Sequence, residues 1–166
     1  MNDTPIHRVG IGTDLHRLAP GGPLTLGGLK LPIDQHLVGH SDADLVLHAV
    51  TDAILGAAGL PDIGEHFPDT DPANAAADST RFLTHALAVA ASRGLAPANV
   101  DVVIHAERPK LSPHKAAIRA NVAALLGISE DRVSIKAKTN EGVDAIGRGE
   151  AMGCTCVVGM THRIRA

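Results

Sequence analysis

The chain has 166 residues and a formal net charge of −3 at pH 7, with 15 Lys plus Arg against 18 Asp plus Glu. This balance, without a run of basic residues, argues against nucleic acid or an anionic membrane surface as a partner. The hydrophobic fraction is 45% but the aromatic fraction is only 1%, so the core must consist of Leu, Ile, Val and Ala. Because small side chains bury little area each, this composition favours further burial by self-association.

The length fits one domain, and we expect residues 1–166 to form a single unit. No apolar run reaches the ~18 residues of a membrane helix, and the start of the chain, Met1 to Pro5, lacks a basic-then-apolar signal. We therefore expect a cytoplasmic protein, unless a targeting segment has been removed. The only cysteines, Cys154 and Cys156, are interpreted as buried free thiols, because their spacing suits neither a disulfide nor a structural zinc site.

Hydrophobic patterning in the first half of the chain predicts a strand, a hairpin and a helix. In order, these are residues 7–13, the pair 24–26 and 29–31, and residues 41–60. The hairpin is indicated by Gly27-Gly28 between two apolar runs. The helix opens with a capping signal, Ser41 followed three residues later by Asp44, and is closed by Gly59.

The second half alternates helices and strands after a long loop. The expected elements are a loop at 61–77, a helix at 79–94 capped by Asp78 or Ser79, a strand at 100–105, a helix from Ser112-Pro113 to 127, and strands at 133–137 and 154–160. This order predicts an α+β fold: a single domain with a mixed sheet of about four main strands, covered by three helices, plus a small hairpin.

Three side chains in two short stretches form a candidate metal site. Asp14 and His16 are separated by one residue directly after the predicted strand, so in an extended backbone they share a face, and His48 comes from the predicted helix. Two imidazoles and one carboxylate suit Zn²⁺, and three protein ligands leave a coordination position for a substrate oxygen. The alternative is that these are structural residues, since such short patterns constrain geometry loosely.

The predicted helix carries a second signal. His40, Asp44, His48 and Asp52 recur every four residues and would form a polar stripe beside its apolar side. A stripe of His and Asp without Lys or Glu is unusual for a solvated helix face. We therefore weigh a lined pocket against an ordinary exposed face.

Two loops also concentrate polar groups. Residues 62–71 gather carboxylates that can bind a polyol or a cation, although Asp, Pro and Gly serve any turn. Residues 106–112 join a strand end to a helix N-terminus, where free N–H groups and Lys110 can hold a phosphate. A solvated loop is the alternative for the second segment.

A third segment, residues 136–142, follows a strand. Lys138 and Thr139 can bind phosphate oxygens there, and Glu141 can bind a hard cation such as Mg²⁺. Together with the zinc candidate, this segment suggests phosphoryl chemistry. Neither a GxxxxGK[ST] nor a GxGxxG loop is present, which disfavours P-loop nucleotide hydrolysis and dinucleotide redox chemistry.

These blocks together resemble one known family over essentially the whole chain. The matching blocks are Asp14-Leu15-His16, His40-Ser41-Asp42-Ala43-Asp44 with His48, Asp62-Ile63-Gly64 leading to Phe67-Pro68-Asp69-Thr70-Asp71-Pro72, Arg108-Pro109-Lys110, Lys136-Ala137-Lys138-Thr139 and Gly147-Arg148-Gly149-Glu150. Their order and spacing are similar to those of the 2-C-methyl-D-erythritol 2,4-cyclodiphosphate synthases. The resemblance implies cyclisation of 4-diphosphocytidyl-2-C-methyl-D-erythritol 2-phosphate with release of CMP, a step of the non-mevalonate isoprenoid pathway.

The resemblance also implies roles for individual residues. Asp14, His16 and His48 would bind zinc, and Glu141 would help to bind a Mg²⁺ or Mn²⁺ ion on the diphosphate. The transition-state stabilisers would be His40 and Thr139. The residues expected to bind substrate, including its cytidine nucleotide, are Ser41, Asp62, Ile63, Gly64, Phe67, Asp69, Asp71, Ala106, Arg108, Pro109, Lys110, Leu111, Ser112, Lys138, Asn140, Ala145 and Arg148.

By the same resemblance the protein is a homotrimer with active sites between adjacent subunits. Arg148 would then lie near the threefold axis, either paired with Glu150 or binding an anion; an exposed charged turn is the alternative. Two competing functions remain at this stage. One is a zinc-dependent phosphodiesterase that uses water as the nucleophile, and the other is a non-catalytic trimeric metal- or isoprenoid-binding protein.

Overall fold

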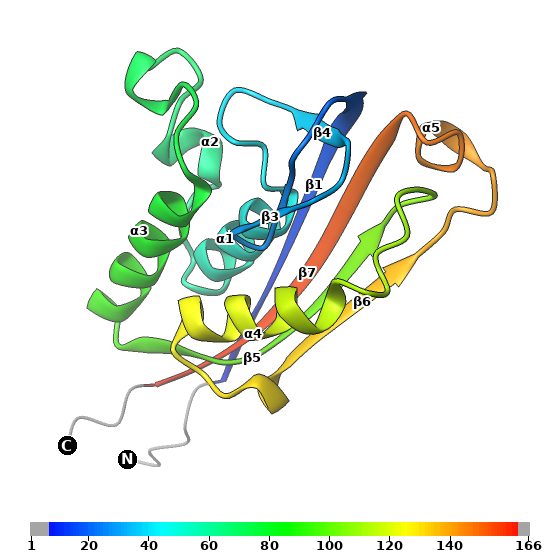
Figure 1. Ribbon diagram of the computed structural model, residues 1–166. Helices are drawn as coiled ribbons and strands as arrows, with labels where there is room; N and C mark the ends of the chain where they lie inside the picture. The colour runs from blue at the N-terminus through cyan, green and yellow to red at the C-terminus, as the bar shows by residue number, and fades with distance from the viewer. Residues whose placement is uncertain (1–6, 163–166) are drawn as a thin grey trace, which may run out of the picture.

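A computed structural model describes residues 7–162 of the chain (Figure 1). The strands are β1 (Arg8–Pro20), β2 (Leu24–Leu26), β3 (Leu29–Leu31), β4 (Gln35–Val38), β5 (Leu95–His105), β6 (Val133–Lys138) and β7 (Ala151–His162). The helices are α1 (Leu45–Ala57), α2 (Ile63–His66), α3 (Ser79–Ser92), α4 (Lys115–Leu126) and α5 (Asp144–Gly147), with 3₁₀ turns η1 (Pro72–Asn74) and η2 (Glu130–Arg132). The expectation for the first five residues lies outside the described part of the chain.

The main sheet has five strands in the order β4-β1-β7-β5-β6, and β2 and β3 form a separate hairpin. All neighbours in the main sheet are antiparallel except β5 and β6, which are parallel and are joined through α4. The long helices α1, α3 and α4 lie on one side of this sheet (Figure 1). The predicted α+β fold with a mixed sheet, three covering helices and a small hairpin is therefore confirmed.

Glycines in β1 let α1 approach the sheet closely. A Cβ atom at Gly10 would collide with the carbonyl oxygen of Ala53, and one at Gly12 with that of Ala49. Along β1 the next residues on this face are Asp14 and His16, because side chains two apart share a face. The close packing of α1 on β1 therefore brings His48 over these two side chains.

The start of α1 differs from the prediction. The helix begins at Leu45 and not at Ser41, because Asp44 is its N-cap and accepts from the N–H groups of Val46 (3.1 Å) and Leu47 (3.0 Å). Its end agrees with the prediction, since Gly59 has φ +67 and directly follows the C-cap residue. The polar stripe that we expected therefore does not run along one helix, and His40 precedes the helix by several residues.

The fully buried Asp44 also anchors the hairpin. Its carboxylate accepts from the N–H of Gly27 at 2.9 Å and from that of Gly28 at 2.6 Å. Burial raises the pKa of this carboxyl group, although the backbone donors around it oppose that shift. Asp44 is therefore a structural residue, and it fits neither of the two alternatives that we weighed, a lined pocket and an exposed helix face.

Several other boundaries shift. Strands β1, β5 and β7 are longer than expected, and α4 begins at Lys115 after His114 and not at Ser112-Pro113. The strand β4 and the single-turn helices α2 and α5 were not predicted.

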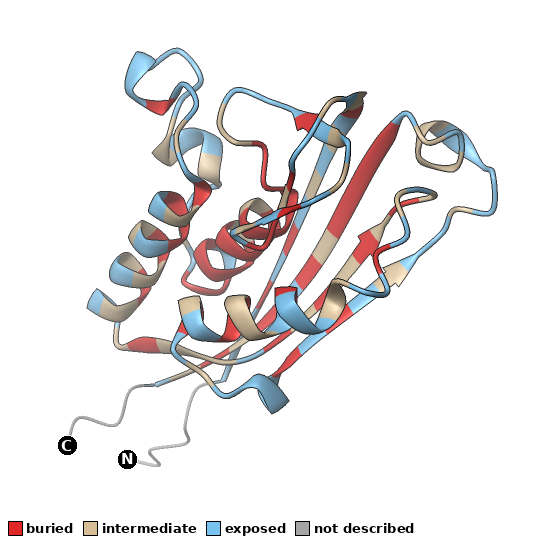
Figure 2. Cartoon of the chain, viewed as in Figure 1, coloured by how far each residue is buried: buried red, intermediate tan, exposed pale blue. Residues whose placement is uncertain are grey.

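Buried residues concentrate along the central strand β7 and on α1 (Figure 2), and the hydrophobic core joins the sheet to the helices. Cys154 and Cys156 belong to this core as free thiols, and burial raises the pKa of Cys156 to about 12, as expected for inert cysteines. No helix within residues 7–162 combines the length and apolarity needed to cross a membrane.

Candidate metal centre

Asp14, His16 and His48 converge on one point between β1 and α1. Oδ2 of Asp14 lies 2.9 Å from Nδ1 of His48 and 3.0 Å from Nδ1 of His16. The His48 contact is a hydrogen bond, whereas Nδ1 of His16 is buried without a hydrogen-bond partner among the described residues. A buried ring nitrogen next to a carboxylate, but not aligned with it, fits a metal ligand better than a structural histidine.

The electrostatics of the three groups support the same interpretation. Burial alone would raise the pKa of Asp14, but the imidazoles of His16 and His48 outweigh it and lower the pKa to about 2. Asp14 is therefore a carboxylate at neutral pH. All three side chains are mostly buried, and each can offer one ligand atom within 4.8 Å of the other two. This group can hold a divalent cation, since two imidazoles and a carboxylate suit such an ion.

A cavity of about 410 Å³ opens beside this group. Its lining includes eight residues that the sequence singled out: His16, His40, Ser41, His48, Ile63, Gly64, Phe67 and Asp69. It also includes Leu15, Arg17, Val38, Gly39, Asn74 and Phe82, which sequence reasoning missed. Both histidines of the candidate metal group thus face a space that is large enough for a small-molecule ligand.

Three acidic residues near the cavity have structural contacts. Asp52 accepts from the N–H of Ile63 at 2.8 Å and so fixes the start of α2 against α1. Asp62 caps α2 through the N–H of Glu65 (3.1 Å), and Asp71 caps η1 through that of Ala73 (2.9 Å). Asp62 and Asp71 are exposed and do not line the cavity of the single chain.

A second polar cluster forms where the parallel strands β5 and β6 end. Ala106 donates its N–H to the carbonyl of Lys138, and the hydroxyl of Thr139 donates to Oε1 of Glu141 at 2.6 Å. Oε2 of Glu107 accepts from the N–H of Asn140 at 3.2 Å. These contacts bring the predicted segments 106–112 and 138–141 together.

Arg148 lies in the same cluster, at the end of α5. Its guanidinium makes two hydrogen bonds to Glu150, each 3.0 Å long, so the expected pairing is present. The carbonyl of Arg148 accepts from Arg108 at 3.1 Å, which ties α5 to the 106–112 segment. Ala145, also expected near substrate, is half-buried within α5.

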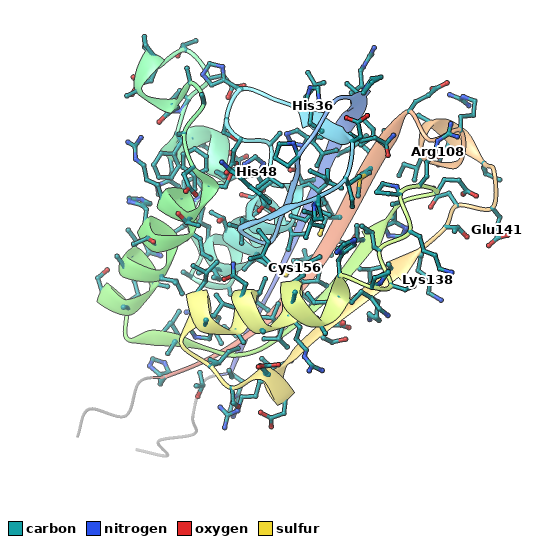
Figure 3. All side chains as sticks on the ribbon, in the orientation of Figure 1. His36, His48, Arg108, Lys138, Glu141 and Cys156 are labelled. Atoms are coloured by element: carbon teal, nitrogen blue, oxygen red, sulfur yellow. The ribbon has the colours of Figure 1, made fainter. Side chains whose placement is uncertain are left out.

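The two groups of polar residues lie apart within one chain. In Figure 3, His48 lies on α1, whereas Arg108, Lys138 and Glu141 lie near the ends of β5 and β6. The strand order agrees, since β7 separates β1 from the β5–β6 pair. One chain therefore carries two separate clusters: the metal centre with its cavity, and the strand-end cluster around residues 138–141.

Fold and site together define an α+β protein with a candidate three-ligand metal centre beside a cavity. The model of the YgbB family matches residues 7–161. A curated relative, the 2-C-methyl-D-erythritol 2,4-cyclodiphosphate synthase of Bordetella petrii, is 55% identical over 150 residues, which cover 90% of this chain and 93% of the relative. The chain therefore belongs to the YgbB family.

Solved structures give the same result. A structure of 2C-methyl-D-erythritol-2,4-cyclodiphosphate synthase is 40% identical, with a TM-score of 0.85, and covers 92% of this chain and 99% of its own. A CDP-bound form of such a synthase is 39% identical, with the same TM-score and coverage. The order of strands and helices described above is thus shared with these enzymes.

Proposed function

We propose that the protein cyclises 4-diphosphocytidyl-2-C-methyl-D-erythritol 2-phosphate to 2-C-methyl-D-erythritol 2,4-cyclodiphosphate and releases CMP, in the non-mevalonate isoprenoid pathway. The observation that carries this proposal is the near full-length match, at 55% identity, to a synthase of that name. It is supported by the grouping of Asp14, His16 and His48 beside a cavity. The enzyme is accordingly a lyase of the phosphorus–oxygen class.

The chemistry requires no nucleophile from the protein. The 2-phosphate of the substrate attacks the β-phosphorus, the bond from that phosphorus to the bridging oxygen breaks, and CMP leaves with the oxygen. Because one anion must approach another, the site has to offset repulsion, align the attack and stabilise the charge that spreads in the transition state.

We assign zinc to the Asp14, His16 and His48 group, and Mg²⁺ or Mn²⁺ to a second position with help from Glu141. The two imidazoles and one carboxylate of the first group fit zinc. At the second position the exposed carboxylate of Glu141 fits a hard cation that is shared with substrate phosphates. When bound, such ions supply positive charge to phosphoryl oxygens.

The remaining roles fall to residues of both clusters. His40 and Thr139 stabilise the transition state, and Ser41 contacts a phosphate. The erythritol part is held by Asp62 to Gly64, with Phe67, Asp69 and Asp71. The cytidine nucleotide is held by residues 106–112 and 138–140, in keeping with the CDP bound by a similar synthase. Ala145 and Arg148 complete the substrate-binding residues, and Arg148 lies near the threefold axis.

The protein acts as a homotrimer, with each active site formed between neighbouring subunits. This proposal is supported by the uncovered face of the sheet, where Val9, Ile11 and Leu15 of β1 are 71%, 65% and 64% exposed. An apolar sheet face is normally covered, and a second copy of the chain can cover it. The arrangement would bring the strand-end cluster of one subunit to the metal centre of another.

Product analysis tests the reaction. Purified protein is incubated with the substrate, zinc and magnesium, and the products are followed by phosphorus NMR. Ring closure gives a cyclic diphosphate and CMP in equal amounts. A zinc-dependent phosphodiesterase would give an open-chain product, and a non-catalytic binding protein would leave the substrate unchanged.

A further inference from the structure

The side of His48 that faces away from the metal centre carries a short hydrogen-bonded chain. Nε2 of His48 lies 2.8 Å from the hydroxyl oxygen of Ser79, the first residue of α3. The Ser79 hydroxyl in turn donates to Oδ1 of Asp42. Ser79 is completely buried, so no solvent competes for these bonds.

The direction of this chain is fixed at its carboxylate end. An ionised carboxylate only accepts hydrogen bonds, so the single proton of the Ser79 hydroxyl must point to Asp42. The Ser79 oxygen can then only accept from His48. The Nε2 atom must therefore carry a proton, whatever the state of the other ring nitrogen.

Asp42 is itself held firmly in place. Its Oδ2 accepts from the N–H of Ser79 at 3.1 Å, and Oδ1 also accepts from the N–H of Asp44 at 3.2 Å. Its own N–H donates to the carbonyl of Ala77 at 3.0 Å. Because both carboxylate oxygens already accept hydrogen bonds, Asp42 fixes the orientation of the Ser79 hydroxyl.

We propose that Asp42 and Ser79 are positioning residues that keep the proton of His48 on Nε2, so that only Nδ1 can offer a lone pair at the metal centre. Nδ1 is the nitrogen that lies 2.9 Å from Asp14, on the side of His16. The inference rests on the metal site of the proposed function. A partner on the non-coordinating nitrogen of a metal-bound histidine fixes the ring orientation and tautomer, and its loss costs typically 10–100-fold in metal affinity.

The two residues can be separated by substitution. Ser79→Ala removes the nearer of the two hydroxyl oxygens at Nε2, which lie at 2.8 Å (Ser79) and 3.1 Å (Ser41). Asp42→Asn releases the direction, because an NH₂ group in place of Oδ1 can donate to the Ser79 oxygen, and the serine proton can then turn towards Nε2. The same change gives up the bond from the N–H of Asp44 to Oδ1. We therefore expect zinc to bind about 10–100-fold more weakly in both variants, with Asp42→Asn affected at least as much as Ser79→Ala.

Asp78→Ala is the matched control, because Asp78 caps the same helix through the N–H of Thr80 (2.8 Å) and is not bonded to His48. Zinc dissociation constants are measured by chelator competition, and thermal stability is measured without metal. The control should lose stability but keep its zinc affinity. Zinc affinity within twofold of wild type in Ser79→Ala or Asp42→Asn would overturn the role of that residue.

A spectroscopic measurement decides the direction of the chain without any variant. In zinc-loaded wild-type protein, long-range proton–nitrogen NMR should show a proton on Nε2 of His48 that exchanges slowly with water. A proton-free Nε2 would overturn the proposal even if the variants fail to fold. If wild-type protein binds no zinc, both the proposed metal site and the positioning role are wrong. If wild-type protein binds zinc and the variants bind it with the same affinity, only the positioning role is wrong.

Discussion

At the scale of single residues, Asp14 is the centre of the candidate metal site. It contacts both histidines through one oxygen, and their imidazoles hold its pKa at about 2 despite its burial. Such a carboxylate is ionised whenever the neighbouring imidazoles are available as ligands. Within residues 7–162 the buried Nδ1 of His16 has no hydrogen-bond partner, although it lies 3.0 Å from Asp14, and this supports a cation site because buried polar atoms in folded proteins normally have partners.

Removal of one ligand should abolish metal binding while the fold survives. We expect His48→Ala to lose most bound zinc and nearly all activity, because two ligands hold zinc much more weakly than three. Zinc content by mass spectrometry and secondary structure by circular dichroism measure the two effects. His85→Ala is the control, since His85 lies on α3 and contacts His66 at 3.2 Å, outside the ligand group. Equal zinc loss in both variants would contradict the assignment.

The second metal should depend on Glu141. We expect Glu141→Gln to raise the magnesium concentration needed for half-maximal activity by about tenfold, because a neutral amide is a poorer ligand for a hard cation than a carboxylate. Zinc content should stay unchanged, since Glu141 and His48 belong to different clusters of the chain. Loss of zinc together with magnesium would show that Glu141 serves the zinc site or the fold.

At the scale of elements, Asp44 joins α1 to the β2–β3 hairpin through four N–H groups. Asp44→Ala should lower the free energy of unfolding by about 2–4 kcal/mol, because it removes a helix cap and leaves buried donors without partners. Asp78→Ala removes an exposed cap with one bond and should cost only about 1 kcal/mol. Urea denaturation measures both changes. A similar small loss for the two variants would contradict the anchoring role of Asp44.

Alternation of apolar residues and turn residues correctly predicted the elements that depend on short sequence patterns. Alternation placed Asp14 and His16 on one face of a strand, and Gly27-Gly28 located the hairpin at its observed residues. The four-residue spacing of Asp44 and His48 predicted that their side chains lie on the same side of a helix, but it did not predict what packs around Asp44. Asp44 is buried because the hairpin folds back over it. Gly27 and Gly28, whose N–H groups bind the carboxylate, precede Asp44 by 17 and 16 positions in the sequence.

Other features left too little local signal. The strand β4 has four residues and lies at the sheet edge, and α2 and α5 are single turns, shorter than a hydrophobic period can reveal. The contact of Ser79 with His48 spans 31 residues. Sequence reasoning therefore named the candidate metal ligands, and included Asp42 only as part of a family block, but did not give Ser79, the residue that connects Asp42 to His48.

At the scale of the whole molecule, helices cover one face of the sheet (Figure 1), and Val9, Ile11 and Leu15 of β1 are exposed apolar residues. We expect Ile11→Lys to convert the proposed trimer to smaller species and to abolish activity, because a charge would be buried at the interface. Sedimentation velocity measures the assembly. Thr84→Lys, which adds the same charge on the exposed side of α3, should leave the trimer intact. A trimeric Ile11→Lys variant would place the interface elsewhere.

In the proposed reaction the attacking oxygen belongs to the substrate and not to water. The most direct test is turnover in water enriched in ¹⁸O, followed by mass spectrometry of both products. Intramolecular cyclisation predicts a cyclic diphosphate and CMP that contain no ¹⁸O from the solvent. One solvent oxygen per turnover in either product would identify hydrolysis by water and would contradict intramolecular cyclisation.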